Sequence, residues 1–349
     1  MNKNNDKNLQ EIFTCSDVEQ STLEYFDGDQ LATSVFLNKY CLKDLSGNFL
    51  ERSPDDMHIR MAKEFARIEE RHQKSPLRKN DSALNESVIY SYLKDFKYIV
   101  PQGSPMYGIG NNHVNVSLSN CVVVDSPEDC VSSIVDSGKD LANLFKRRCG
   151  VGIDISTLRP DGTSVNNSAK TTTGAWSFAD FYSYVCRMIG QNGRRGALMI
   201  SMDVRHPDIE KFITMKHDLT KVTGANVSVK LTDDFMRAVS DDSNYLQRWP
   251  VDSKNPCIES EVRALDVWNL IVSSATKTAE PGILMWGNIL NNLPANEYPN
   301  FKTVTTNPCG EIPLSKYDSC RLISVNLSNF VLNKFSKSAY FDWDKFDEV

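Results

Sequence analysis

The sequence of 349 residues lacks the features that mark several special classes of protein. It contains no run of about 18 apolar residues, and its polar start, MNKNNDKNLQ, does not resemble a secretion signal. Its net charge of -6 provides no broadly basic surface for nucleic acid backbones. We therefore expect a cytoplasmic globular protein that binds neither membranes nor nucleic acid.

Cysteine spacing excludes two further classes. The chain has 9 cysteines but no CxxC pair and no Cys/His cluster with zinc-ligand spacing, so we expect no metal site and no secreted disulfide framework. Most cysteines of this kind are small buried hydrophobic residues. We expect this of Cys15, Cys41, Cys130, Cys149, Cys186 and Cys257.

The first hundred residues divide into a polar segment and a segment with helical patterning. Residues 1–33 are polar and read as an arm or a first helix. Residues 34–97 contain the amphipathic stretch DDMHIRMAKEFARIEERH and predict a small helical domain.

After Pro101, short apolar runs alternate with helical segments. The runs include SNCVVVD, GVGIDIS, GALMIS and ANVSVKL, and this alternation predicts a largely parallel sheet covered by helices. We expect one helix over residues 129–148, after the start signal Ser126-Pro127, and another over about 176–189. Five or six strands are too few to close a barrel.

The segment TNPCGEIPL, residues 306–314, combines three chemically useful side chains. Asn307, Cys309 and Glu311 occupy alternate positions, while Pro308 and Gly310 favour a tight, non-helical backbone. In an extended loop the three side chains would project the same way and reach one substrate. A surface turn in which these residues are incidental explains the segment equally well.

Together with the following YDSCRL, this segment resembles the finger loop of ribonucleotide reductases. SLSNCVVV, GVGIDISTLRPDGT, QNGRRGALM and HPDIEKFI also occur in the order found in that family. The resemblance implies that Cys309 forms a thiyl radical that removes the 3′ hydrogen of a ribonucleotide, that Glu311 is the base for the 3′-hydroxyl, and that Asn307 holds the sugar. Cys121 and Cys320 match the redox pair, although Cys121 alone would more often be core filler.

The resemblance implies further binding residues. Ser104 and Asn120 would contact the substrate, although both depart from the residues common in the family. Asp129, Arg159, Gln191, Arg194 and Arg195 match a site that binds a deoxynucleotide or ATP effector. A turn such as QNGRRG is otherwise typical of a solvated surface loop.

The fold that the resemblance implies is the first half of a ten-stranded α/β barrel with its finger loop, over residues 98–349, preceded by the helical domain. We therefore expect reductase activity to need a complementary chain that supplies the carboxy-terminal half of the barrel, a thioredoxin-like reductant and, as in relatives, a homodimer. The 11 positions from Cys309 to Cys320 favour adenosylcobalamin as radical source over a separate metal-containing small subunit. The alternatives are a nucleotide-binding regulatory or scaffold fragment without catalysis, and a related glycyl-radical barrel enzyme.

Overall fold

The computed structural model describes residues 11–72, 84–189 and 196–349. The chain forms two compact units: the first comprises residues up to Leu118 together with Arg321–Val349, and the second comprises Ser119–Cys320. Among the described residues, no helix combines the length and the apolar character needed to cross a membrane. Each unit has its own hydrophobic core.

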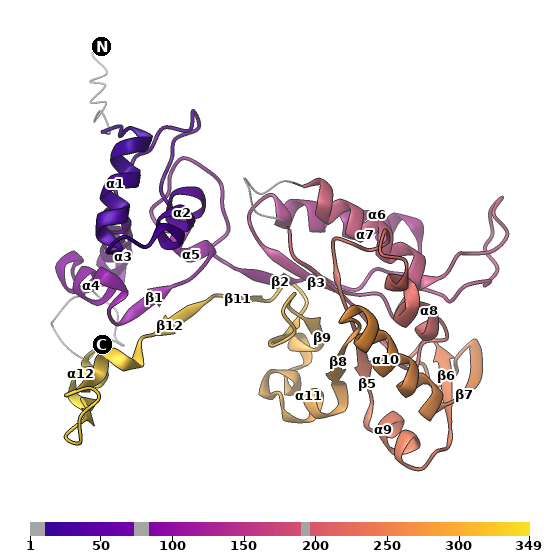
Figure 1. Cartoon of the computed structure of the whole chain (residues 1–349). Coiled ribbons are helices and arrows are strands. Elements are labelled where there is room, and N and C mark those ends of the chain that lie inside the picture. Colours follow the sequence, from indigo (N-terminus) through magenta and orange to yellow (C-terminus); the bar gives the residue numbers. More distant parts are fainter. Residues whose placement is uncertain (1–10, 73–83, 190–195) are drawn as a thin grey trace. The chain divides into compact units, whose positions relative to one another are not determined.

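The first unit is mainly helical (Figure 1). Its helices are α1 (Cys15–Tyr25), α2 (Gln30–Lys39), α3 (Pro54–Glu69), α4 (Glu86–Leu93), α5 (Ser104–Gly108) and α12 (Trp343–Glu348), with short 3-10 turns at Glu70–His72, Lys94–Phe96 and Leu327–Phe330. Its strands are β1 (Ile99–Pro101), β12 (Ile323–Val325), β13 (Val331–Leu332) and β14 (Tyr340–Phe341). Helix α3 begins at Pro54 because the side chain of Ser53 caps it by accepting from the Asp55 amide.

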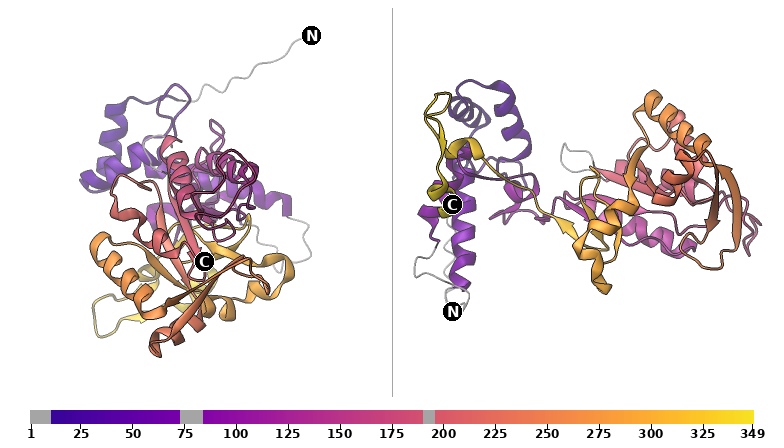
Figure 2. Two further views of the ribbon diagram at one scale, coloured as in Figure 1. Left: turned by 90° about the vertical axis from the view of Figure 1, so that its right-hand side faces the viewer. Right: turned by 90° about the horizontal axis from the view of Figure 1, so that it is seen from below.

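The last 29 residues pack with this helical unit, as the yellow segment in Figures 1 and 2 shows. Strand β12 pairs antiparallel with β1, and the rings of Tyr98 and Phe330 lie 4.8 Å apart. The sequence-based division at residues 33/34 and 97/98 stays a prediction. The contacts in the structure divide the chain at other positions. Helices α1 and α2 share a hydrophobic core with α3, and residues 321–349 join the same unit through the pairing of β12 with β1.

The second unit is built on one sheet with the strand order β11-β2-β3-β4-β5-β8. From β2 to β8 all neighbours are parallel, and β11 adds antiparallel to β2, which confirms the predicted largely parallel sheet. These strands are β2 (Cys121–Val123), β3 (Gly150–Asp154), β4 (Leu198–Asp203), β5 (Asn226–Leu231), β8 (Gly282–Met285) and β11 (Ser319–Cys320).

Helices and two hairpins surround this sheet. The helices are α6 (Val131–Phe145), α7 (Ala175–Met188), α8 (Ile209–Thr214), α9 (Asp233–Ser240), α10 (Ala264–Thr278) and α11 (Trp286–Asn292), with 3-10 turns at Met215–His217, Pro294–Glu297 and Pro299–Phe301. The hairpins pair β6 (Asn244–Trp249) with β7 (Ile258–Arg263), and β9 (Thr303–Thr306) with β10 (Pro313–Ser315). We call residues 303–315 the finger hairpin.

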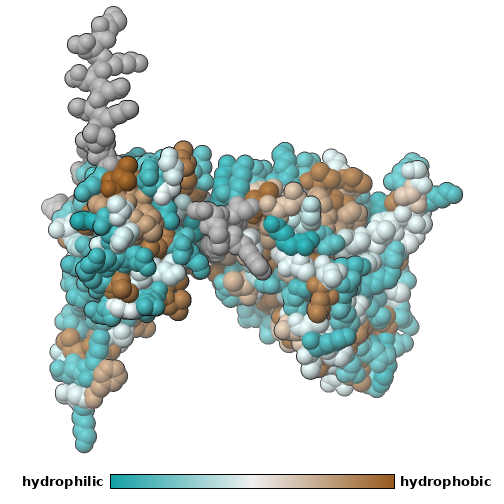
Figure 3. All heavy atoms as spheres, turned by 45° about the horizontal axis from the view of Figure 1, so that its top comes forward, coloured by the Kyte–Doolittle hydropathy of each residue, from teal (hydrophilic) through white to brown (hydrophobic). Residues whose placement is uncertain are grey.

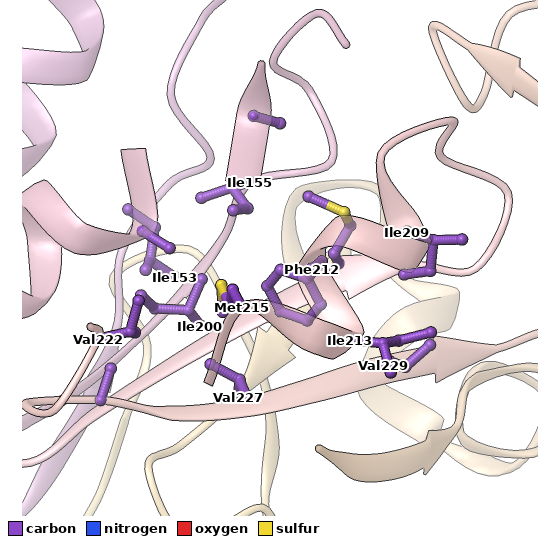
Figure 4. Packing of buried hydrophobic residues seen from close by; sticks show 14 of the residues in the cluster. Ile153, Ile155, Ile200, Ile209, Phe212, Ile213, Met215, Val222, Val227 and Val229 are labelled. Carbon is purple, nitrogen blue, oxygen red and sulfur yellow. The ribbon is translucent and has the colours of Figure 1, made fainter. Parts of the chain in front are cut away.

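The two faces of the sheet differ in chemistry because strand residues alternate between them. On the helix face, branched side chains such as Ile153, Ile200 and Val229 are fully buried against Phe212 and its neighbours (Figure 4). The opposite face, which we call the polar face, carries glycines and polar side chains. Its members in β3, β4 and β5 are Gly150, Gly152, Asp154, Met199, Ser201, Asp203, Asn226, Ser228 and Lys230, of which only Met199 is apolar.

The expected helix over residues 129–148 is shorter than the sequence suggested. Helix α6 begins at Val131 after the N-cap Cys130, so the predicted start after Ser126-Pro127 is wrong. Asp129, predicted in the first turn, lies before the helix, where its carboxylate binds Arg159. The helix predicted over about 176–189 is confirmed as α7.

The expectation that six cysteines are buried is only half correct. Cys41, Cys149 and Cys186 are buried, but Cys15, Cys130 and Cys257 are exposed. These three lie at helix starts or in a loop, where no apolar surface covers them.

Candidate functional site

The finger hairpin carries its turn at residues 307–310. The amide of Gly310 donates to the carbonyl oxygen of Asn307 at 3.0 Å, and Gly310 has φ +87°, a left-handed conformation that glycine adopts without strain. The side-chain oxygen of Asn307 accepts from the Ile312 amide at 3.1 Å, which closes the loop from the other side. The tight, non-helical backbone predicted for NPCGE is confirmed.

The turn changes how its side chains are directed. Asn307 is fully buried, whereas Cys309 and Glu311 are exposed. The prediction that the three project the same way from an extended strand is therefore wrong. The reversal of the chain at Pro308 and Cys309 breaks the two-residue alternation on which that prediction depended.

Two glycines of β3 let the finger hairpin lie directly on the polar face, on the side opposite α6 and α7 (Figure 1). A Cβ atom at Gly152 would overlap the carbonyl oxygen of Thr306, and one at Gly150 would come within 2.8 Å of the Pro308 ring. Any side chain at either position would push the finger hairpin away from the sheet.

The strand register brings Cys121 and Cys320 face to face. They are direct partners in the antiparallel pairing of β2 with β11, and the amide of Asn120 donates to the carbonyl of Cys320 at 2.9 Å. Directly opposite residues in such a pair have Cα atoms roughly 4.5–5.5 Å apart. That separation lies within the range that a disulfide spans.

The finger hairpin reaches this cysteine pair through Asn307. Its Nδ2 donates to the sulfur of Cys121 at 3.9 Å. The Pro308 ring and the sulfur of Cys121 both lie against Gly150, and a negative charge on Cys309, the next residue, would raise the pKa of Cys121 further. The fold therefore gathers at one place four of the five residues predicted to be catalytic: Asn307, Cys309, Cys121 and Cys320.

Burial raises the pKa of Cys121 to about 12, and the neighbouring Cys320 thiol contributes to the same shift. The amide of Asn307 opposes it, because a hydrogen bond to sulfur favours the thiolate. At neutral pH Cys121 is therefore a protonated thiol. It can give up a proton or a hydrogen atom, but it is a poor nucleophile until something removes its proton.

Asp129 and Arg159, two predicted effector residues, form a close pair. Arg159 donates from Nε to one carboxylate oxygen of Asp129 at 2.6 Å, and the Arg159 amide donates to the other at 3.0 Å. The Arg159 side chain is 30% exposed and the Asp129 side chain is 22% exposed, so a ligand can reach both. The other predicted effector residues, Gln191, Arg194 and Arg195, lie outside the described residues.

The two predicted substrate residues belong to different units. Asn120 precedes β2 in the second unit and is buried beside the cysteine pair. Ser104 is buried at the start of α5 in the first unit.

Sequence reasoning missed the residues beneath the finger hairpin. Lys230 donates to the carbonyl of Val304 at 2.6 Å, and Asn226 donates to that of Pro308 at 3.1 Å. The alternation of glycine or polar residues with branched ones in GVGID and NVSVK was the available sign of a polar sheet face.

This arrangement defines a class of protein: a half-barrel of parallel strands whose polar face holds a cysteine-bearing hairpin against a redox-capable cysteine pair. The chain belongs to the ribonucleotide reductase family. The family profile described as "Ribonucleotide reductase, barrel domain" matches residues 119–349. The predicted half of an α/β barrel with a finger loop is thereby confirmed.

Curated relatives agree with this assignment. The chain is 34% identical over 218 residues to a vitamin B12-dependent ribonucleoside-diphosphate reductase of Thermoplasma acidophilum, covering 62% of this chain and 28% of the relative. It is 34% identical over 235 residues to the enzyme of that name from Mycobacterium tuberculosis, covering 66% and 32%. A Variola virus ribonucleoside-diphosphate reductase large subunit is 26% identical over 262 residues, covering 66% and 33%. The chain thus matches about a third or less of the length of these relatives.

Proposed function

We propose that this chain carries the thiol chemistry of a ribonucleoside-diphosphate reductase, which makes deoxyribonucleotides for DNA synthesis. The observation that carries the proposal is the convergence of Cys309, Asn307 and the cross-strand pair of Cys121 and Cys320 at the tip of the finger hairpin. A hydrogen-abstracting sulfur must lie near both the sugar and the thiols that reduce it, because reacting groups have to be held in close and correct geometry.

In the first step, a thiyl radical on Cys309 takes the hydrogen atom from C3′ of the ribose, which leaves a Cys309 thiol and a carbon radical on the sugar. Glu311 accepts the proton of the 3′-hydroxyl. The exposure of Cys309 and Glu311 at the turn allows both to meet a substrate, while buried Asn307 fixes the loop that carries them.

In the second step, the 2′-hydroxyl leaves as water after taking a proton from a thiol of the pair. Cys121 and Cys320 supply two electrons and two protons in all and end as a disulfide. Glu311 returns its proton to the 3′ oxygen, while Cys309 returns its hydrogen to C3′ and becomes the radical again. The raised pKa of Cys121 suits this role, because the thiol retains at neutral pH the proton that the leaving hydroxyl needs. A thioredoxin-like reductant then restores both thiols.

Specificity between substrates would come from a nucleotide effector at Asp129 and Arg159. An anionic phosphate would compete with the Asp129 carboxylate for the Arg159 guanidinium, so effector binding would rearrange this ion pair. Gln191, Arg194 and Arg195 are the further effector contacts we propose, and Ser104 and Asn120 are proposed substrate contacts.

The five parallel strands from β2 to β8 are proposed to be completed by five more, supplied as the carboxy-terminal half of the barrel. Strand β8 pairs only with β5 among the described residues, and Ile283 and Met285 at this edge are 41% and 42% exposed. Strands from that half would pair with the free edge and cover these side chains.

We also propose a homodimer that uses α6. Val131 and Val135 on α6 and Tyr184 and Met188 on α7 are more than half exposed, whereas most of the surface in Figure 3 is hydrophilic. Two copies of this helix pair would bury these apolar side chains against each other.

The radical source is proposed to be adenosylcobalamin, because two similar relatives are named vitamin B12-dependent. Adenosylcobalamin supplies a carbon radical that can generate the thiyl radical. Cys309 suits such a source, since it lies exposed at the end of a hairpin turn. A separate radical-generating small subunit is the alternative. Turnover of the assembled enzyme with adenosylcobalamin and no second protein would decide for the cofactor, and turnover only with a small subunit would decide against it.

The function is tested by Cys309→Ser in the enzyme assembled with the rest of its barrel. We expect the variant to lose ribonucleotide reduction and to retain effector binding, while the matched variant Cys257→Ser, also at an exposed cysteine of the second unit, keeps both. Full activity of Cys309→Ser would favour the regulatory or scaffold alternative. Activity that depends on a glycyl radical would favour the related barrel enzymes.

A further inference from the structure

The polar face of the sheet contains a buried ion pair that the thiol chemistry does not use. Lys230 of β5 and Asp154 of β3 lie 2.7 Å apart, and their side chains are 7% and 6% exposed. Removing two charges from water costs several kcal/mol per ion, and well-packed apolar residues often replace such a pair at no loss of stability. Stability alone therefore does not explain why this pair is present.

Lys230 contacts the finger hairpin directly. Its ammonium group donates to the carbonyl oxygen of Val304 in β9 at 2.6 Å and lies 4.3 Å above the ring of Trp286. A lysine ammonium has three protons to donate. The carboxylate of Asp154, the Val304 carbonyl and the Trp286 ring together give it a complete set of partners in a dry site.

Asp154 contacts the finger hairpin through one intermediate. Its Oδ2 accepts from the hydroxyl of Ser201 at 2.7 Å, and this hydroxyl lies 2.6 Å from the hydroxyl of Thr305. Ser201 and Thr305 are both fully buried. The ion pair therefore reaches two consecutive residues of β9, 304 by its cation and 305 by its anion.

The contacts matter because β9 is held on the polar face by side-chain contacts such as these and not by pairing with the six-stranded sheet. In the described sheet pairings, β9 has only β10 as a neighbour, and an isolated two-stranded hairpin is marginally stable in water. Asn307 follows Thr305 by two positions and Cys309 follows it by four. A shift of β9 along the polar face would carry both of these residues away from Cys121.

We infer that the Lys230–Asp154 pair, acting through Val304, Ser201 and Thr305, sets the position of the finger hairpin and so places Asn307 and Cys309 against the cysteine pair. Lys230 and Asp154 are positioning residues, since they act on the finger hairpin through Val304, Ser201 and Thr305. The inference rests on the proposed function only for its effect on turnover. The effect on the finger hairpin itself is independent of activity.

The test is the double variant Lys230→Met/Asp154→Leu. It removes both charges together, so neither partner is left buried and unpaired, and the unfolding midpoint should stay close to that of the wild type. A matched control is Lys216→Met/Glu280→Leu, which removes another largely buried ion pair of the second unit, one whose further hydrogen bonds go to the backbone of Ala225 and Val227.

The first readout is amide hydrogen exchange of the full chain over residues 303–312. We expect at least about a tenfold faster exchange in Lys230→Met/Asp154→Leu than in the wild type and the control, because the hairpin opens locally more often. The second readout is turnover of the assembled enzyme, where kcat should fall by about 10²-fold, the loss associated with a displacement near 1 Å, while KM changes little.

Unchanged exchange over residues 303–312 in a folded double variant would overturn the inference, whatever the activity. If the double variant does not fold, Thr305→Val replaces it, because this nearly isosteric change removes only the hydroxyl that Ser201 contacts. The same faster exchange is then expected, and unchanged exchange again refutes the role. If the assembled wild-type enzyme had no reductase activity, the proposed function would be refuted. The positioning role would still be tested by hydrogen exchange over residues 303–312, because that measurement does not depend on activity.

Discussion

At the scale of single residues, the site depends on the pKa of the Cys121 thiol, which burial raises. Cys121 lies partly buried beside Cys320, and the pKa of about 12 leaves a very small thiolate fraction at neutral pH. An exposed cysteine such as Cys257 is not subject to this burial. The two thiols should therefore differ strongly in their reaction with alkylating agents, since only the thiolate reacts.

We predict that alkylation of Cys121 accelerates about tenfold for each pH unit between pH 7 and pH 10 without reaching a plateau. The rate should rise with pH because the raised pKa of Cys121 keeps its thiol protonated over this range. Each further pH unit therefore increases the thiolate fraction about tenfold. Peptide mass spectrometry after timed iodoacetamide pulses measures the rate, with Cys257 as the reference in the same sample. A plateau below pH 9 would mean that burial does not dominate this site.

The Asn307 hydrogen bond provides a second test at this scale. It lowers the pKa of Cys121, so its loss in Asn307→Ala should raise that pKa further and slow alkylation of Cys121 at every pH. The same pulses measure this change. Faster alkylation in Asn307→Ala would show that the amide shields the sulfur more than it stabilises the thiolate.

At the scale of elements, the site depends on a sheet with one apolar face and one polar face. Strand β3 contributes Ile153 to the packed helix face and Gly152 to the contact with Thr306. A single strand thus supports both the core and the finger hairpin. Substitutions on its two faces should separate stability from the position of the finger hairpin.

We predict that Gly152→Ala displaces the finger hairpin, because the added methyl group would overlap the Thr306 carbonyl oxygen. The strain should cost about 1–3 kcal/mol of unfolding free energy and change the alkylation rate of Cys309 at least severalfold. The control is Ile153→Val on the helix face, which should cost ~1 kcal/mol and leave Cys309 unchanged. Equal Cys309 rates in both variants would contradict a close fit between hairpin and strand.

The sequence was sufficient to predict the elements whose patterns are local. GALMIS and ANVSVKL became β4 and β5, and the tight turn at NPCGE follows from residues within the segment itself. The start of α6 was mispredicted at Ser126-Pro127, and the contact of Asp129 just before the helix is with Arg159, 30 positions away, which no local pattern shows. The partners of Lys230 could not be predicted either, since Asp154 and Val304 become its neighbours only when the sheet and the hairpin meet.

At the scale of the whole molecule, the second unit presents half of a barrel whose last parallel strand has one free edge among the described residues. We predict that the chain alone reduces no ribonucleotide and that activity appears when the carboxy-terminal half of the barrel is present. Hydrogen exchange of β8 measures the pairing directly: its amides should become protected on assembly, while those of β3 stay protected throughout. Robust reduction by the chain alone would refute the need for completion.

The account as a whole depends on Cys121 and Cys320 being the source of the reducing equivalents, started by Cys309. The most direct measurement is a single turnover of the assembled, fully reduced enzyme without external reductant, followed by rapid alkylation and peptide mapping. We predict one disulfide between Cys121 and Cys320 for each deoxyribonucleotide formed, and neither product in Cys309→Ser. Deoxyribonucleotide formed while both thiols remain free would contradict the central claim.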